Sequence, residues 1–458
     1  MKKLILFFVI VFFSSSNAFA EKGYLGDFND FLETNERKIK EYGVKGLVVN
    51  ICKEEKRMSK KWLEAECMDR PGGTWVINNK LKIKFYKDRS NLPWDAKPNF
   101  DTLLYYGFVS VYDDSGFKDV GSKGSSEPYK FSFNLREDSD VKKEINETGM
   151  LSYLLYEDGK IVIDEMSPKD KFGKVFTNET KYHSQSVGKS ISSYILGHAI
   201  CKGHIESIDA KLNDWPLVKN SLYHNQKIID LINMKAGDEK YFSSKDKSNI
   251  FANSNSKYSV TNRTIKSVME NELKNSKKTG NKWAYNNLLP HLIMNYIIFK
   301  AGNDEFLKLL EDVFTNKAKI EYDTSFAEPQ TSTSEDKATT STLLLTRYDY
   351  LRIAKSMLDD WQNDTCEGKY LKSLYERKTK KNYDYGDTKQ AFTNPKSYGG
   401  FFHLEPSGMK KRHIFIMDGY GGQTFTIDFD KGRIVSTLAI HRDFNWMKIA
   451  HSVIKKGK

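Results

Sequence analysis

The 458-residue sequence is short of several residue types that would mark a special class of protein. Its 10 prolines and 29 glycines exclude a collagen-like or low-complexity chain. With 39% hydrophobic and 13% aromatic residues, the chain is not wholly disordered and can bury a large core. It has only four cysteines, none in CxxC spacing, and no Cys/His cluster with the spacing of a zinc site. We therefore expect no structural metal.

Long hydrophobic runs are also absent, except for one near the start. Lys2 and Lys3 precede the apolar run Leu4–Phe13, and the small residues Ala18 and Ala20 follow it. This order predicts a secretory signal peptide over residues 1–20. Ten apolar residues are too few to span a bilayer, and no later segment is long and apolar enough. We expect an exported protein, in a bacterial periplasm, without stable membrane insertion.

Export places the cysteines where disulfides can form. Cys52 and Cys67 lie close together in a charged segment, where a local bridge is plausible. Cys201 falls late in an apolar helical pattern and is expected to be a buried thiol. The pattern does not settle the pairing.

Acidic residues are outnumbered, with 60 Asp and Glu against 72 Lys and Arg and a formal charge of +12. No nucleic-acid-binding motif accompanies this surplus. We interpret it as a solvated basic surface and expect no nucleic-acid partner.

The chain divides into three parts that differ in composition and hydrophobic pattern. After the signal peptide, residues 21–146 are polar, lysine-rich and irregular, with strand-like stretches at Lys82–Tyr86 and Tyr105–Val111. We assign them to an N-terminal accessory region of unknown role. Residues 147–458 form the third part.

The third part begins with a hairpin pattern, in which Asp158-Gly159 is the turn. Helices, then strands, then one more helix follow, so the fold class is α+β, and both ends of this part meet in one antiparallel sheet. The expected helices are 186–201, 227–234, 288–300, 304–314, 348–358 and one from Trp446; the expected later strands are 413–417, 424–428 and 433–441.

The leading candidate for chemistry is Ser186 with Lys189. The serine opens an apolar helix, and the lysine lies one turn later on the same face. A lysine whose pKa is lowered by burial can take the serine proton. Ser-x-x-Lys also occurs elsewhere, for example at Ser452 and Lys455, where we interpret it as solvated surface.

Two later segments could complete a site. Tyr285 and Asn287 precede an apolar helix and could supply a proton shuttle and an orienting amide, although Asn287 could simply cap the helix. The stretch Asp418–Gln423 contains three glycines before a strand. Its glycines could let a substrate approach the backbone, and Gln423 could donate an oxyanion hydrogen bond, although the stretch could also be only a tight turn.

Together, Ser-x-x-Lys, Tyr-x-Asn and a glycine-rich stretch near the C-terminus resemble the serine β-lactamase and penicillin-binding-protein superfamily. The chain looks most like its class C-related branch, which includes esterases and 6-aminohexanoate-dimer hydrolases. Further similar stretches are 184–190, 195–205, 229–237, 278–287 and 341–354. The resemblance implies a β-lactamase/transpeptidase-like fold: an antiparallel sheet flanked by helices, with a helical subdomain and here an N-terminal extension.

By position, the resemblance implies that Ser186 is the acylated nucleophile and Lys189 its base. Tyr285 would shuttle the proton and Asn287 would orient. The oxyanion and substrate-binding residues would be Tyr420, Gly421, Gly422 and Gln423. Tyr420 stands where the family usually has Lys or His, a cation that helps bind a substrate carboxylate.

The sequence therefore predicts an exported serine hydrolase that cleaves a small-molecule ester or amide, or a peptide-like substrate, without a cofactor. One alternative is a true β-lactamase or D-Ala-D-Ala carboxypeptidase. The other is a non-catalytic protein of the same fold that binds cell-wall fragments.

Overall fold

The structure is a computed structural model of the chain. It describes residues 117–456 except 170–172, 174–175, 240, 242–264, 328–338, 382–394, 420, 441 and 443, together with the short paired strands β1 (Gly46–Leu47) and β2 (Leu81–Lys82). The strand predicted over 105–111 and most of that over 82–86 lie outside the described residues, as does the predicted bridge between Cys52 and Cys67.

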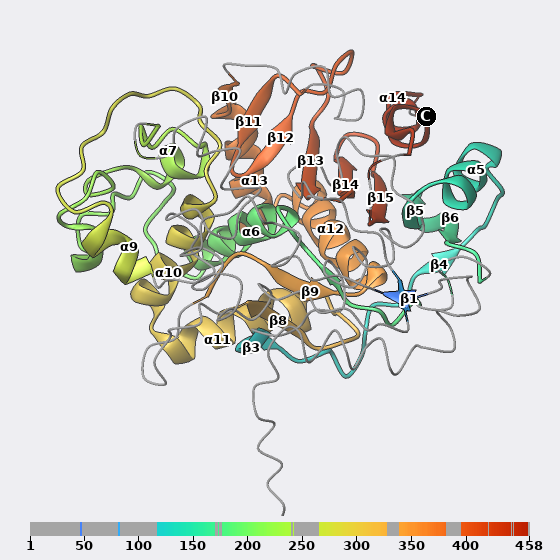
Figure 1. Ribbon diagram of the computed structural model, residues 1–458, viewed down its shortest axis with the longest axis horizontal. Coiled ribbons are helices and arrows are strands. Elements are labelled where there is room, and N and C mark those ends of the chain that lie inside the picture. Colours follow the sequence, from blue (N-terminus) through green and yellow to red (C-terminus); the bar gives the residue numbers. More distant parts are fainter. Residues whose placement is uncertain are drawn as a thin grey trace, which may run out of the picture.

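A nine-stranded sheet forms the centre of the molecule (Figure 1). Neighbouring strands are antiparallel except β6 and β4, which are parallel. The strands in spatial order are β10 (Thr379–Lys380), β11 (Ser397–Gly399), β12 (Phe402–Leu404), β13 (Ile414–Gly419), β14 (Gln423–Asp428), β15 (Arg433–Ala439), β5 (Met150–Glu157), β6 (Lys160–Met166) and β4 (Ser132–Phe133).

The predicted hairpin and the meeting of early and late strands are confirmed. Strands β5 and β6 are joined by Asp158 and Gly159, both with positive φ (51° and 77°), which suits a tight hairpin turn. Strand β15 pairs with β5, so Tyr156 lies opposite Ile434. The first and last long strands of the sheet are therefore neighbours.

Helices cover both faces of this sheet. Helices α6 (Val187–Cys201), α12 (Arg347–Gln362) and α13 (Cys366–Glu376) lie on one face, and α5 (Ser139–Glu147), η7 (Met447–His451) and α14 (Ser452–Lys456) on the other. Helix α6 is buried on all sides from Val187 to Ala199, between the sheet, α10 and α13. Such an all-round apolar helix belongs inside a core, so its first turn is held rigidly.

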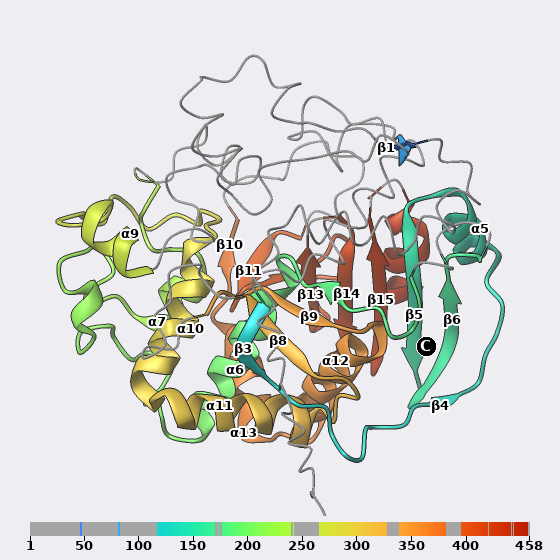
Figure 2. The same cartoon turned by 60° about the horizontal axis from the view of Figure 1, so that its bottom comes forward.

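A helical part lies to one side of the large sheet (Figure 2). Its elements are η4 (Pro216–Val218), α7 (Ile228–Ile232), α9 (Ile265–Asn271) and α10 (Leu288–Ala301), followed by α11 (Asn303–Glu311) and the π-helical η6 (Asp312–Lys317). A second, four-stranded sheet has the order β3 (Phe117–Ser122), β8 (Thr324–Ala327), β9 (Leu343–Leu345) and β7 (Tyr182–His183). The α+β class and the helical subdomain agree with the sequence prediction.

The described residues before 147 do not stand apart from those that follow. Strand β3 pairs with β8, β4 pairs with β6, and α5 packs on β5 and β6. Val141 and Ile145 of α5 are buried in the same apolar cluster as Tyr153 and Ile416. Residues 117–146 therefore share the core of the larger domain, although their polar texture suggested a separate region.

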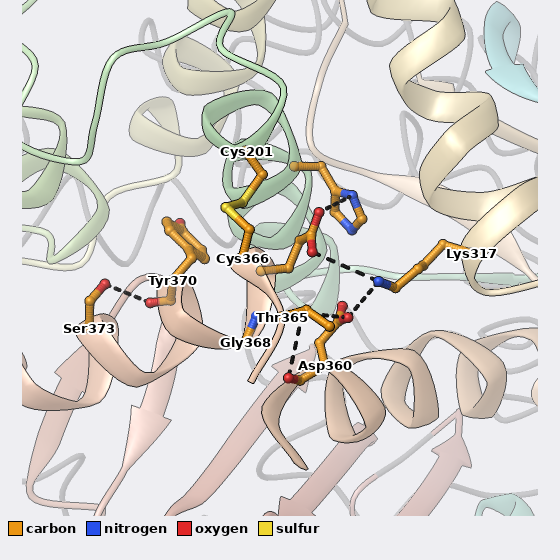
Figure 3. Close-up of a disulfide and its surroundings, with 10 residues drawn as sticks. Cys201, Lys317, Asp360, Thr365, Cys366, Gly368, Tyr370 and Ser373 are labelled. Atoms are coloured by element: carbon orange, nitrogen blue, oxygen red, sulfur yellow. Dashed lines mark hydrogen bonds and ion pairs between the residues drawn. A yellow bond between two sulfur atoms is a disulfide. The ribbon is translucent and has the colours of Figure 1, made fainter. Parts of the chain in front are cut away.

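The prediction of a free buried thiol at Cys201 is wrong. Cys201 ends α6 and forms a disulfide with Cys366, the first residue of α13 (Figure 3). Beside it, Lys317 contacts the carboxylates of Asp360 and Glu367. The two cysteines are 165 residues apart, and no local pattern indicates that the end of α6 meets the start of α13.

Candidate active site

Ser186 lies at the junction of β7 and α6. The preceding Gln185 has φ of +48°, an uncommon conformation for a side-chain-bearing residue, and turns the chain from strand to helix. Ser186 occupies the N-cap of α6, yet its side chain makes no capping hydrogen bond. The hydroxyl instead points to a different partner.

That partner is Lys189, whose Nζ lies 2.7 Å from the Oγ of Ser186. The lysine side chain is 6% exposed. Burial lowers the pKa of Lys189 from 10.5 to about 7, and the carboxylate of Asp418 opposes this by favouring the ammonium. A lysine that is half neutral near neutral pH can accept a proton from an adjacent hydroxyl.

Gly188 lets another segment run directly over this first helical turn. A Cβ on Gly188 would lie 1.9 Å from the carbonyl oxygen of Ser341. The amide of Ser341 in turn donates to Nδ1 of His291, at 2.8 Å. Burial, aided by the charge of Lys189, lowers the pKa of His291 to about 3, so this imidazole is neutral.

Tyr285 lies beside the lysine. The Nζ of Lys189 is 5.1 Å from the centroid of the Tyr285 ring, and this tyrosine is 8% exposed. Trp283 and Tyr398 make ring contacts with it at 6.3 and 6.4 Å between centroids. The structure thus brings together Ser186, Lys189 and Tyr285, the three residues to which the resemblance assigned the reaction.

The capping role considered for Asn287 is wrong, because its side chain makes no capping bond. The neighbouring Asn286 does this, accepting from the amide of Leu288 at 2.7 Å. The orienting role of Asn287 stays a prediction. The Tyr-x-Asn pattern leaves its middle position unspecified, so the sequence did not indicate a role for Asn286.

The glycine-rich stretch forms the turn between β13 and β14, with Gly419 paired to Gln423. Gly421 and Gly422 have φ of 88° and 110°, which require glycine. Gln423 is fully buried, and its Nε2 donates to the carbonyl of Ala439 at 3.2 Å. Tyr420 lies outside the described residues.

Gly419, at the start of this turn, packs against the two residues that precede Ser186. A Cβ there would lie 2.8 Å from the carbonyl oxygen of Ser184 and 3.1 Å from the Cβ of Gln185. A side chain would therefore push the end of β13 away from Ser186. Gly419 is one of the three glycines noted in the sequence, and its tight packing against the chain before the nucleophile is visible only in the fold.

A charged cluster that the sequence did not indicate borders the site. The carboxylate of Asp418 is ion-paired with Arg442, which also donates to the carbonyl of Gly419. Burial raises the pKa of Asp418 to about 6, although Arg442, Lys381 and Lys189 favour its ionised form. Their sequence positions carry no common motif, so only the fold reveals the cluster.

His403 lies on β12, the strand next to that of Asp418, and Lys381 directly follows β10. The Nζ of Lys381 is 3.5 Å from Nδ1 of His403 and 5.8 Å from the Trp283 ring centroid. Burial and the charges of Lys381, Arg442 and Lys189 hold the pKa of His403 well below its ordinary value. Two cations, Lys381 and Arg442, thus act on this region from segments other than the glycine-rich turn.

Within the described ranges, no group of three or more His, Cys, Asp or Glu side chains is placed to hold a metal ion. In the same part of the chain, the structure contains no helix of the length and apolarity needed to cross a bilayer.

Comparisons with known proteins establish the fold. A protein described as a 6-aminohexanoate-dimer hydrolase, from Bacillus anthracis, matches with a TM-score of 0.54 and 14% identity over 77% of this chain and 92% of that one. A protein described as a β-lactamase, from Bacteroides dorei, matches with a TM-score of 0.50 and 14% identity over 69% and 94%. No protein-family model and no curated protein sequence matches this chain. The predicted β-lactamase/transpeptidase-like fold is confirmed.

Proposed function

We propose that this chain is an exported serine hydrolase that cleaves an ester or amide through an acyl-enzyme on Ser186. The observation that carries the proposal is the 2.7 Å contact between the hydroxyl of Ser186 and the buried amine of Lys189. Burying a lysine costs free energy of folding, because its charged amine loses water. A neutral amine beside a serine hydroxyl can offset this cost by serving as the base in nucleophilic catalysis.

In acylation, the neutral amine of Lys189 takes the hydroxyl proton of Ser186 while the Oγ of Ser186 forms a bond to the substrate carbonyl carbon. The proton then passes through the Tyr285 hydroxyl to the leaving alcohol or amine, and the bond to that group breaks. In deacylation, water gives a proton to the same pair and its oxygen attacks the acyl carbon, which releases the acid and restores Ser186. Asp418 would stabilise the transient ammonium of Lys189.

The oxyanion would be held by the backbone N–H groups of Ser186 and Gln423. The close approach of Gly419 to Ser184 supports this arrangement, because it holds the glycine-rich turn against the chain just before the nucleophile. Asn287 would orient the substrate, and Gly421, Gly422 and Tyr420 would border it.

The substrate class follows from the charges near the serine. Tyr420 in place of a cation favours substrates that lack a carboxylate. A β-lactamase or D-Ala-D-Ala carboxypeptidase is the second candidate, and the cations Lys381 and Arg442 beside Asp418 favour it. Similarity to proteins described as a 6-aminohexanoate-dimer hydrolase and as a β-lactamase is compatible with either.

Labelling with a fluorophosphonate probe tests the nucleophile. We expect stoichiometric labelling of the wild type and none of Ser186→Ala. Ser452→Ala is a matched control, because Ser452 and Lys455 have the same spacing on another helix, and it should label fully. An unlabelled wild type would leave the non-catalytic binding protein as the better explanation.

Turnover of p-nitrophenyl esters and of a chromogenic cephalosporin then separates the substrate classes. We expect the esters to be hydrolysed faster. Faster turnover of the cephalosporin would contradict the ester or amide substrate and favour a β-lactamase.

Export is tested by expressing the full chain in a bacterium and sequencing the N-terminus of the periplasmic product. A mature chain that begins at Glu21 supports the signal peptide. An intact N-terminus on cytoplasmic protein contradicts it.

A further inference from the structure

A buried carboxylate outside the serine–lysine pair supports the segment that carries Tyr285. Asp238 follows α7 and is 1% exposed. Its Oδ2 accepts two hydrogen bonds, from the hydroxyl of Tyr223 at 2.9 Å and from Nδ2 of Asn286 at 2.5 Å. Both donors are neutral groups, so burying this acid has a cost that two hydrogen bonds offset only in part.

Asn286 connects this carboxylate to the start of α10. While its Nδ2 donates to Asp238, its Oδ1 accepts from the amide of Leu288. The side chain is therefore held at both ends and is 3% exposed. Since Asn286 follows Tyr285 directly, holding its side chain restrains the backbone from which Tyr285 projects.

The backbone around both residues is docked as well. The amide of Ala284 donates to the carbonyl of Met234 at 2.8 Å, and the amide of Thr279 donates to that of Gly237 at 2.7 Å. Gly237 has φ of +69°, and a Cβ there would lie 2.3 Å from the carbonyl oxygen of Gly280. Residues 234–238 thus hold residues 279–286 in place through backbone hydrogen bonds and close packing.

We propose that Asp238 is a positioning residue for catalysis, which holds Tyr285 with its ring beside Lys189 through its hydrogen bond to Asn286. This inference rests on the proposed function of Tyr285. Asp238 touches neither Ser186 nor Lys189 in any contact the structure shows, so its effect on the reaction must pass through Tyr285. A displacement of about 1 Å in a reacting group is enough to cost up to ~100-fold in rate.

A double-mutant cycle separates this role from simple structural support. In the otherwise wild-type enzyme, Asp238→Ala should lower kcat for ester hydrolysis by about 10-fold or more with KM changed less than about twofold. In a Tyr285→Phe background, the same substitution should change kcat by less than about twofold, because the hydroxyl it positions is already gone. An equal loss in both backgrounds would overturn the proposal.

Two variants guard against a trivial loss of folding. Asp238→Asn keeps an oxygen that can accept from Asn286 and should retain most of the activity. Tyr153→Phe removes a different buried hydrogen bond, from Tyr153 to the carbonyl of Ile449. It should destabilise the fold comparably without changing kcat, and a kcat loss equal to that of Asp238→Ala would count against the proposal.

Amide hydrogen exchange supplies a readout that does not depend on catalysis. In Asp238→Ala, the amides of residues 284–288 should exchange faster, while those of β13 to β15 should keep their rates. Unchanged exchange at 284–288 would overturn the positioning role even if the wild type proves inactive. If the wild type is inactive but Asp238→Ala still exchanges faster at 284–288, the coupling between Asp238 and this segment is supported and the proposed function is the part that fails.

Discussion

The ionisation of Lys189 should set the lower pH limit of activity. Its pKa is lowered from 10.5 to about 7 by burial. At pH 7 about half of the molecules then have a neutral amine, whereas an ordinary lysine would be neutral in only about one of 3,000. Burial thus raises the fraction of competent base by about a thousandfold.

The assay is the second-order rate of fluorophosphonate labelling between pH 5.5 and 9. Below pH 7 the rate should fall about tenfold per pH unit, because the ammonium cannot accept the proton of Ser186. His291 and His403 have pKa values lowered by burial, the former to about 3, so neither imidazole should produce this limb. Asp418 titrates nearby, with a pKa of about 6, and must be distinguished.

Asp418→Asn makes that distinction. The carboxylate favours the ammonium of Lys189, so its removal should lower the lysine pKa and move the acidic limb to lower pH. A limb that stays in place or moves to higher pH in this variant would refute the assignment to Lys189. So would a wild-type rate that is constant from pH 9 to pH 5.5.

Three further predictions concern the same helix. Lys189→Met should abolish labelling yet stabilise the fold below pH 7 by up to about 5 kcal/mol. This gain in the free energy of unfolding should shrink as pH rises from 7 to 10.5, because the buried amine of the wild type is then neutral. Urea unfolding at pH 6 and pH 9 measures the gain, and equal gains at the two pH values would contradict the prediction. Gly188→Ala should lower labelling by about 100-fold or prevent folding, since its Cβ would overlap the carbonyl of Ser341, and a wild-type rate would contradict the packing. Replacing Cys201 and Cys366 with serine should lower the free energy of unfolding by about 2–5 kcal/mol, as urea titration against the oxidised protein would show, while kcat stays within about twofold; an unchanged unfolding midpoint would contradict this.

Much of the fold could be predicted because its elements have local signals. The hairpin around Asp158 and Gly159, the apolar helix that begins after Ser186, and the last three strands follow hydrophobic periodicity and turn residues. The position of Gly203, with φ of +80° just after α6, likewise follows from its conformational freedom.

The supporting contacts could not be predicted, because they join segments that are distant in sequence. The disulfide joins positions 165 residues apart, and Arg442 meets Asp418 only after β14 and β15 return the chain. Asp238 and Asn286 are brought together by tertiary packing alone. Sequence patterns therefore identified the proposed reacting groups, whereas the residues that tune or hold them appeared only in the fold.

The pairing of β5 with β15 also constrains how the chain folds. β5 lies within the large sheet, yet one of its two partners, residues 433–439, follows it in the sequence only after all the intervening helices and strands. Contacts between such distant segments require a large loop to close, which makes folding slow. The sheet cannot be completed until β15 has been synthesised, so β5 waits for its second partner while the helices between them are already formed or forming.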